Sequence, residues 1–401
     1  MIRAQTMTDE LKTGAYTLDE KLWTKGRNVI VFLLMVTWIA SLFGAFTDRV
    51  QFLHSYLNAY WYFITIIVGA MFFVFVGFLT GSAWSIPFRR FMETIVACVP
   101  LGLLLFVPIA LGLGDIYEWV HGSTNPVVAG KLNYLNPQFF LIRVVVYFAI
   151  WSFFGLNVYR QSTKQDKTRA AAQMNAASAF SAPGLLLTFL TVSLASFDWV
   201  MSLDPRWYST IFGIYCYVGG GLCFMAVVTL ISLGFRRIGV LKSTITEEHY
   251  HDLGKWMFAL TIFWAYIAFS QYLLIWYANL PEETIFFRNR LQGSWRWWSA
   301  LLLVGHFIVP FLVLIGRAVK RNYGVLAGMA VWIMAMHFVD GYWLIMPNFS
   351  KGGASLHWLD FITWGAVGSA FSLLFWWRLK NHAIVPVGDL RFEEGLRFTN
   401  I

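Results

Sequence analysis

The sequence predicts an all-α integral membrane protein with ten transmembrane helices. Its composition, its apolar segments and its distribution of positive charge each support this prediction. Hydrophobic residues make up 58% of the 401 residues, only 13% are charged, and the mean hydropathy is +0.60. A soluble domain of this size carries far more charge on its surface. The composition therefore indicates a polytopic membrane protein before any motif is considered.

Each apolar segment is long enough to cross a bilayer as a helix. A helix needs about 20 residues to span ~30 Å of hydrocarbon, and a backbone in lipid must satisfy its own hydrogen bonds. We expect spans at residues 28–47, 57–80, 91–112, 138–160, 183–201, 208–233, 254–279, 297–319, 324–347 and 357–378. Aromatic side chains that favour the headgroup region lie at the expected ends, namely Trp61, Tyr62, Trp207, Tyr208, Trp297, Trp298, Trp376 and Trp377. Pro100, Pro108 and Pro310 predict local kinks.

The distribution of Lys and Arg predicts that both termini are cytoplasmic. With this orientation, 21 of the 30 basic residues lie in cytoplasmic segments and 7 in outer loops, while Arg143 and Lys255 fall within spans. Such a three-to-one excess follows the positive-inside rule. The formal net charge of +9 is thus a feature of topology. A nucleic-acid surface is the weaker interpretation, because the basic residues are dispersed over six segments.

The predicted membrane domain covers residues 28–378, between a cytoplasmic N-terminal tail at 1–27 and a cytoplasmic C-terminal tail at 379–401. The N-terminal tail is polar and mixed in charge, unlike a signal peptide, and it either meets a partner or is simply solvated. Cys98, Cys216 and Cys223 lie in spans without a paired motif. We expect them to be core residues rather than disulfide or iron–sulfur cysteines.

The eight central spans carry signs of an internal repeat. The second and sixth spans both begin with aromatic residues, contain several glycines and end at a double Arg, at 89–90 and 236–237. Four helices per unit is an even number, so both units share one topology. We therefore expect two parallel four-helix bundles, at about 57–201 and 208–347, flanked by helices one and ten. The Gly-rich runs predict close helix packing.

Ionisable residues inside a bilayer are costly and suggest function. His337 and Asp340 are three residues apart, so they share one face of the ninth helix. By the helical rise, Asp340 lies roughly 10 Å below the outer end of its helix, His337 roughly 15 Å, and His306 of the eighth helix roughly 13 Å. A carboxylate beside an imidazole can pass a proton along or bracket a quinone headgroup. The alternative is that each His packs against its Asp as structural glue.

Four further polar residues enter the outer part of the membrane, and pairing explains them at least as well as function. Asp198 and Arg143 come from the fifth and fourth helices and are able to pair with each other. His357 and Asp360 repeat the three-residue spacing at the outer start of the tenth helix, where water is close. We take Asp198, His337, Asp340 and Asp360 as proton-path candidates, with Arg143, His306 and His357 as supporting polar residues. Glu93 lies within one turn of a cytoplasmic end, where we expect it to pair or snorkel.

The sequence predicts that the chain itself binds no cofactor. His306 and His337 are the only histidines at a depth suited to bis-histidine haem, and a single pair without repeated spacing is weak evidence for it. Neither a phosphate-binding Gly-Lys loop nor a serine-hydrolase elbow is present in the sequence.

Three stretches resemble a known family of membrane subunits. They are GSAWSIPFRRFME at 81–93, SFDWVMSLDPRWYST at 196–210 and MHFVDGYWLIMP at 336–347. Together with ten helices, they resemble the polysulfide-reductase, NrfD-type integral membrane subunits. The resemblance is nearest to the ActF-type subunit, the smaller of the two large membrane subunits of bacterial alternative complex III. It extends over about residues 28–380, and the DWVMSLDP segment is its most specific part.

The resemblance implies a subunit of a bacterial inner-membrane quinol:acceptor oxidoreductase. The implied partners are a c-haem subunit, an iron–sulfur subunit, a second NrfD-like ten-helix subunit and smaller membrane subunits. Haem c and iron–sulfur clusters would then lie on those partners, and menaquinol would bind nearby, usually in the larger paralogue. Carried over to this sequence, Asp198, His337, Asp340 and Asp360 are implied proton-path groups.

Two other functions compete with an electron-transfer subunit that anchors its partners and conducts protons. A secondary transporter is also built from repeats with polar groups near the midplane. Against it, the acidic and histidine groups gather toward the outer half, and no pair of broken helices is evident. A purely structural anchor would have all its polar groups locked in pairs.

Overall fold

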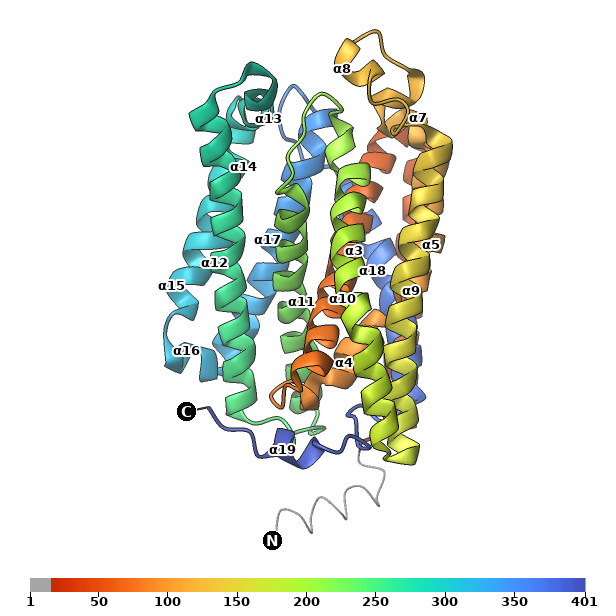
Figure 1. Ribbon diagram of the computed structural model, residues 1–401, viewed down its shortest axis with the longest axis vertical. Coiled ribbons are helices and arrows are strands. Elements are labelled where there is room, and N and C mark those ends of the chain that lie inside the picture. The colour runs from red at the N-terminus through yellow and green to blue at the C-terminus, as the bar shows by residue number, and fades with distance from the viewer. Residues whose placement is uncertain (1–15, 401) are drawn as a thin grey trace.

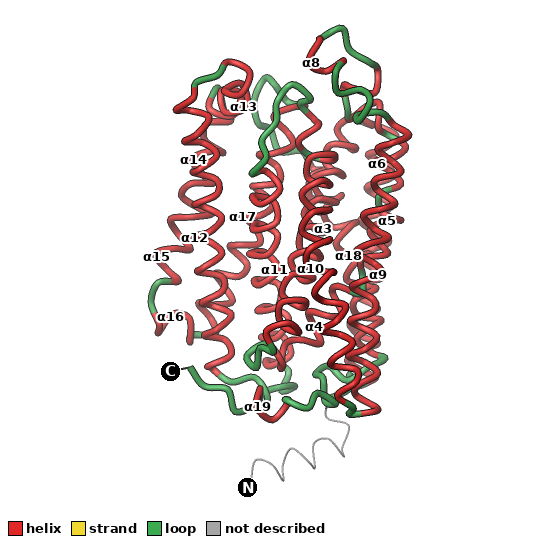
Figure 2. The backbone as a smooth tube through the Cα atoms, in the orientation of Figure 1, coloured by secondary structure: helices red, strands yellow, loops and turns green. Residues whose placement is uncertain are grey.

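The computed structural model describes residues 16–400, which form helices and no strand (Figures 1 and 2). Ten helical segments are long and apolar enough to cross a membrane, as the sequence predicts. They are α2 (Glu20–Thr47), α3 (Arg49–Thr80), α4–α6 (Ile86–Leu111), α9 (Pro137–Thr168), α10 with a short 3-10 turn (Ala171–Leu203), α11 (Phe212–Arg237), α12 (Glu247–Ala278), α14–α15 (Trp295–Leu314), α17 (Tyr323–Phe349) and α18 (Trp358–Lys380). The chain is a multi-pass membrane protein by this architecture.

Several helices extend beyond the predicted spans, because hydropathy registers only the part of a helix that lies in hydrocarbon. Helix α12 begins at Glu247 rather than 254, where Thr246 forms a capping box with His249. Helix α10 begins at Ala171 rather than 183 and continues through Pro183. Helix α2 already begins at Glu20, within the predicted 1–27 tail. Residues 1–15 and 401 of the predicted tails lie outside the described residues.

The start of α3 is the most informative boundary error. We expected Trp61 and Tyr62 at a membrane interface, but α3 begins at Arg49 and both side chains are buried about three turns inside it. The polar residues of the first turns lower the hydropathy of this segment and hide its true start. These polar side chains face other helices instead of lipid, as the functional site shows.

Proline shapes two spans as predicted. In the third span, the helix breaks near Cys98 and again at Phe106, which separates α4 (Ile86–Val96), α5 (Val99–Leu105) and α6 (Val107–Leu111). The breaks accompany Pro100 and Pro108. In the eighth span, a π-helical segment, η3 (Leu302–Ile308), precedes Pro310 between α14 (Trp295–Leu301) and α15 (Val309–Leu314). This span ends at Leu314, before the predicted residue 319, because the backbone becomes extended at Gly316.

The eight central spans pack as two rings of four (Figure 1). In the first ring, α3 packs on α4 and α10, and α9 packs on α4, α5 and α10. In the second ring, α11 packs on α12 and α17, while the eighth span packs on α12 and α17. Helices α3 and α11 pack on each other and are the most buried spans. In each of them, 72% of the residues in the central apolar segment are buried. Helix α18 packs on α2 and α3 beside the first ring.

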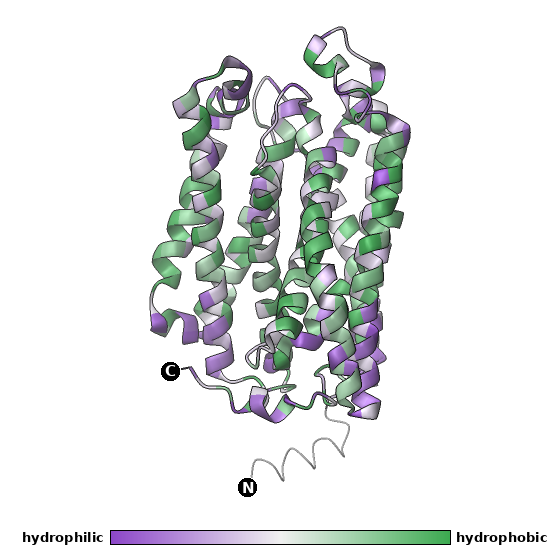
Figure 3. Ribbon diagram, in the orientation of Figure 1, coloured by the Kyte–Doolittle hydropathy of each residue, from purple (hydrophilic) through white to green (hydrophobic). Residues whose placement is uncertain are grey.

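Both ends of the described chain lie at one end of the bundle, which we call the α19 end after α19 (Phe392–Leu396). There the amide of Ile384 donates to the carbonyl of Tyr16 (2.8 Å). The opposite, α13 end carries α13 (Pro281–Leu291), together with the short helices α7 (Leu113–Ile116) and α8 (Pro126–Ala129). Figure 3 shows hydrophobic residues along the middle of the bundle and hydrophilic residues gathered toward the two ends. All three cysteines are buried and unpaired, as predicted.

Candidate functional site

His337 and Asp340 are buried on one face of α17, but they contact different helices. The Nε2 atom of His337 lies 2.9 Å from the hydroxyl of Thr65 on α3. Asp340 accepts a hydrogen bond from the hydroxyl of Tyr215 on α11. Within residues 16–400, no hydrogen bond joins His337 to Asp340, and each side chain bonds to a different neighbouring helix.

The Thr65 hydroxyl has more than one possible hydrogen-bond partner. It lies within hydrogen-bond distance of the carbonyl oxygens of Trp61 (3.0 Å) and Tyr62 (2.9 Å) as well as of His337. A hydroxyl has one proton to donate. It donates that proton either to a carbonyl, while accepting from Nε2–H of His337, or to Nε2 itself. In both arrangements Nδ1 of His337 is buried without a partner among the described residues.

Glycines of α11 bring these helices together. A Cβ atom on Gly220 would lie 2.4 Å from the carbonyl oxygen of Thr65, so only glycine permits this approach of α11 to α3. A Cβ atom on Gly219 would lie 3.6 Å from Asp340, His337 and Trp264 alike. Gly219 therefore faces the centre of the polar cluster, and the predicted role of the Gly-rich run in close packing is confirmed.

His306 reaches the same region from the eighth span. The π-helical segment η3 carries it, and its ring packs on Trp264 with centroids 4.1 Å apart. In a π-helix each carbonyl accepts from the amide five residues later, and Pro310 has no amide proton to give to the carbonyl of Gly305. This carbonyl accepts from the indole of Trp332 (2.7 Å) instead. Both ring nitrogens of His306 are buried without a hydrogen-bond partner in the described part of the chain. Such groups are rare and are satisfied by ordered water in most proteins.

A polar stripe along α3, which sequence reasoning missed, runs from the α13 end to this cluster. It consists of Gln51, Ser55, Asn58, Tyr62 and Thr65, all buried. Their spacing of four, three, four and three residues places them on one helical face, over roughly 21 Å. The signal was present in the sequence, but the predicted span began only at residue 57.

Asp360 lies at the upper end of this stripe. One carboxylate oxygen accepts from the hydroxyl of Ser55 (2.5 Å), with Gln51 at 3.5 Å, and the other accepts from the backbone amide of His357 (2.8 Å). This bond to His357 is part of a capping box at the start of α18. The side chain of His357 accepts from the amide of Leu359 (3.4 Å) instead of bonding to Asp360.

Asn58 lies between the two ends of the stripe. Its side chain is fully buried, and neither its amide nitrogen nor its oxygen has a partner among the described residues. Gly341 of α17 lies opposite, where an added Cβ would be 2.5 Å from the Asn58 oxygen. Asn58 thus faces the same helix as His337 and Asp340. Its contact at Gly341 lies one turn beyond His337 toward the α13 end and directly after Asp340.

Asp198 and Arg143 form a closed pair, as one of the two sequence-based alternatives predicted. The guanidinium donates to both carboxylate oxygens (2.8 and 3.0 Å), and Tyr147 donates to one of them (2.7 Å). Arg143 also donates to the carbonyl of Tyr134 (2.9 Å) and stacks over its ring. With Asp198 0% and Arg143 7% exposed, both oxygens of the buried carboxylate accept hydrogen bonds. This geometry favours a structural role for both residues.

A second buried ion network closes the α19 end. Glu93 lies 3.2 Å from both Arg89 and Arg90, as expected for a carboxylate three and four residues along the helix. Arg90 also pairs with Asp166 of α9 (2.6 Å), and Arg89 pairs with Asp389 of the C-terminal segment. The pairing of Glu93 is confirmed, but it is fully buried rather than snorkelling. The Asp389 contact joins residues 300 positions apart, which no sequence spacing reveals.

Arg290 of α13 is a buried cation that sequence reasoning placed in an outer loop. It donates to the carbonyls of Trp343 (3.0 Å) and Leu344 (2.8 Å) of α17. Pro347 has no amide proton, so it leaves the carbonyl of Trp343, four residues earlier, without its helical partner. Burial lowers the pKa of Arg290 to about 9. Arg290 thus fixes the outer end of the helix that carries His337 and Asp340.

No protein-family model matches this chain, and no curated protein matches it either. Within residues 16–400, no group of three His, Cys, Asp or Glu side chains is arranged to hold a metal ion. The arrangement of the site therefore rests on its own geometry. It joins Asp360, Asn58, His337, Asp340 and His306 along a buried polar line, and it sets Asp198 apart in an ion pair.

Proposed function

We propose that this chain is a membrane subunit of a quinol-oxidising electron-transfer complex, of the alternative complex III type, and that it conducts protons. The observation that carries the proton role is the buried polar stripe of α3, which links Asp360 to the His337–Asp340 cluster. The three family-like stretches support the complex. Electrons would travel on a c-haem subunit and an iron–sulfur subunit, with quinol bound in a second ten-helix subunit.

The chemistry of the stripe suits proton transfer through hydrogen-bonded groups. Within residues 16–400, Asp360 and Asp340 are carboxyl groups without an arginine partner, and Nδ1 of His337 has no hydrogen-bond partner. Asn58 and His306 present further polar atoms without a partner in the same part of the chain. Water molecules that satisfied these atoms would complete a chain of proton donors and acceptors. Ionisable groups kept inside a membrane at such cost are typical of proton relays.

We further propose that the α19 end faces the cytoplasm of a bacterium and that the two rings of helices are a parallel repeat. The excess of Lys and Arg in the loops of the α19 end supports this orientation. The rings support the repeat, since corresponding helices make corresponding contacts in each. In this orientation the stripe forms the outer part of a proton path, and His337, in contact with Thr65, lies at its inner end.

Proton release per electron in the reconstituted native complex tests the proton role. Asp340→Asn and Asn58→Leu are expected to preserve assembly and lower this ratio. Tyr217→Phe serves as the control, because it removes another buried, unpartnered polar atom, outside the stripe. An unchanged ratio in both stripe variants would remove the proton role.

Identification of the proteins that co-purify from native membranes in mild detergent tests the complex itself. We expect c-haem and iron–sulfur subunits with a second ten-helix protein. A clean homo-oligomer would contradict this proposal and favour the secondary transporter.

A further inference from the structure

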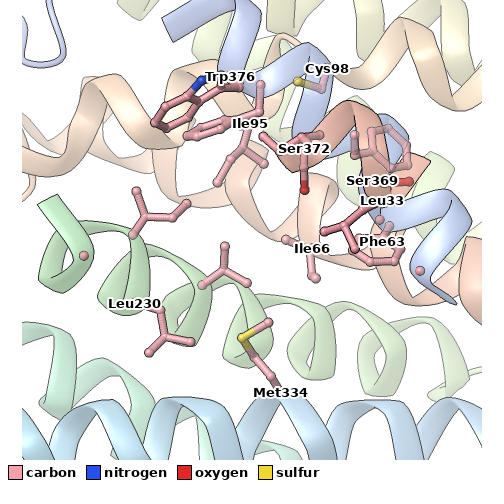
Figure 4. Close-up of a pocket in the computed structure, with 18 of the residues that line it drawn as sticks. Leu33, Phe63, Ile66, Ile95, Cys98, Leu230, Met334, Ser369, Ser372 and Trp376 are labelled. Carbon is pink, nitrogen blue, oxygen red and sulfur yellow. The ribbon is translucent and has the colours of Figure 1, made fainter. Parts of the chain in front are cut away.

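A large apolar groove lies in the half of the bundle nearer the α19 end, beside Tyr62 of the polar stripe, whose ring packs on Phe63 and Trp364 of the groove lining. Its volume is about 730 Å³, and side chains of α2, α3, α11 and α18 form most of its walls (Figure 4). Leu230 and Met334 lie across the space from Ile95 and Ser372. A cavity of this size with a predominantly apolar lining is typical of a ligand site.

The dimensions of the groove match one leaflet of a bilayer. Its wall on α11 extends from Val227 to Ile238, which corresponds to roughly 16 Å of helix rise and to about half of the ~30 Å hydrocarbon core. Gly234 of this wall faces open space, since an added Cβ would have no neighbour within 4 Å. Leu33 and Ile238 of the lining are 47% and 52% exposed, so the groove opens on the lipid-facing surface.

Two arginines without carboxylate partners lie near the end of the groove that is closer to α19. Arg237 immediately precedes Ile238 of the lining, and it is exposed. Arg27 lies one turn before Ile30 of the lining, and its side chain bonds only to Asn28 and stacks over Trp23. Neither arginine forms an ion pair within residues 16–400. By contrast, the nearby Lys380 pairs with Glu20 (3.0 Å).

We propose that this groove binds an anionic phospholipid, with one acyl chain between α11 and α18 and the phosphate at Arg237 and Arg27. An acyl chain fits an apolar groove one leaflet long, and a phosphate supplies the negative charge that both guanidinium groups lack. Basic sites at the ends of transmembrane helices attract anionic headgroups in this way. An uncharged isoprenoid would fill the groove but gain nothing from the arginines.

The test is lipid-dependent thermal unfolding of the full chain, purified in neutral detergent, with added phosphatidylglycerol or phosphatidylcholine of identical acyl chains. The wild type is expected to gain more stability from phosphatidylglycerol. The double variant Arg27→Gln/Arg237→Gln is expected to lose this preference, through an affinity for phosphatidylglycerol about tenfold lower. Gly234→Phe, which fills the groove, is expected to abolish the response to both lipids.

Matched controls separate the groove from general effects of charge and bulk. Arg317→Gln removes another exposed arginine that forms no ion pair in the described chain, and Gly328→Phe adds a ring at another helical glycine with open space around it. Both are expected to behave as the wild type. Equal stabilisation by the two lipids, an unchanged preference in the double variant, or recovery of an isoprenoid instead of phospholipid from the purified chain would each overturn the proposal.

Discussion

Asp198 and Asp340 are buried carboxyl groups on the last helix of each four-helix ring, yet their surroundings differ. Asp198 meets both a guanidinium and a tyrosine hydroxyl, so its charge is neutralised and both its oxygens are hydrogen-bonded. Within residues 16–400, Asp340 has a tyrosine hydroxyl but no cation as a partner, and it lies beside imidazoles with unpartnered nitrogens. A carboxylate bound to Arg is fixed in one state. A carboxyl group without a cation retains the ability to exchange a proton.

The largest expected difference between the two regions is in stability. Asp198→Ala leaves the guanidinium of Arg143 buried without a counter-charge, and we expect the free energy of unfolding to fall by about 3–5 kcal/mol. Unfolding of the purified chain in mixed detergent micelles measures this loss. If Asp198→Ala unfolds like the wild type, the pair is not the structural unit described here.

The next effect concerns the helix contact that supports Asp340. Gly220→Ala places a Cβ 2.4 Å from the Thr65 carbonyl, so α3 and α11 must separate. We expect a loss of about 1–3 kcal/mol in the free energy of unfolding, as for other overpacked sites. Gly328→Ala is the control, because open space surrounds that glycine. Equal stability of the two variants would show that the close approach is not required.

Asp340→Asn should affect stability less than Asp198→Ala, because the amide oxygen still accepts from Tyr215. We expect a change of about 1 kcal/mol or less in the free energy of unfolding. Proton release per electron should show the opposite order, because it should fall more in the Asp340 variant than in the Asp198 variant. A stability loss as large as that of Asp198→Ala would place Asp340 among the structural residues.

Thr65→Val should have an effect of similar size to that of Asp340→Asn. It removes the hydroxyl that hydrogen-bonds to His337 at nearly constant volume, at a cost of about 0.5–1.5 kcal/mol in the free energy of unfolding. Thr188→Val on α10 is a matched change, since the Thr188 hydroxyl is buried without a partner among the described residues. Proton release should fall in the Thr65 variant alone, and a fall in both would point to a general packing effect.

Local sequence spacing predicted part of the site and missed the rest for a physical reason. Glu93 was expected to pair or snorkel near a cytoplasmic end, and it pairs with Arg89 and Arg90, four and three residues before it on the same helix. His337 and Asp340 were expected to share a helical face, but each side chain forms its hydrogen bond with a different neighbouring helix. A shared helical face brings two residues close together, whereas their partners depend on which helices pack beside that face.

The sequence by itself determined the ten helices, the proline breaks and the close packing at the Gly-rich runs. These features follow from hydropathy and backbone chemistry, which act over a few turns of one helix. Only the tertiary structure decided that Asp198 is closed by Arg143, that Asn58 and Thr65 face α17, and that Arg290 holds its outer end. Those contacts join residues far apart in the chain, and packing between helices selects them because every buried polar group must find its partner in space.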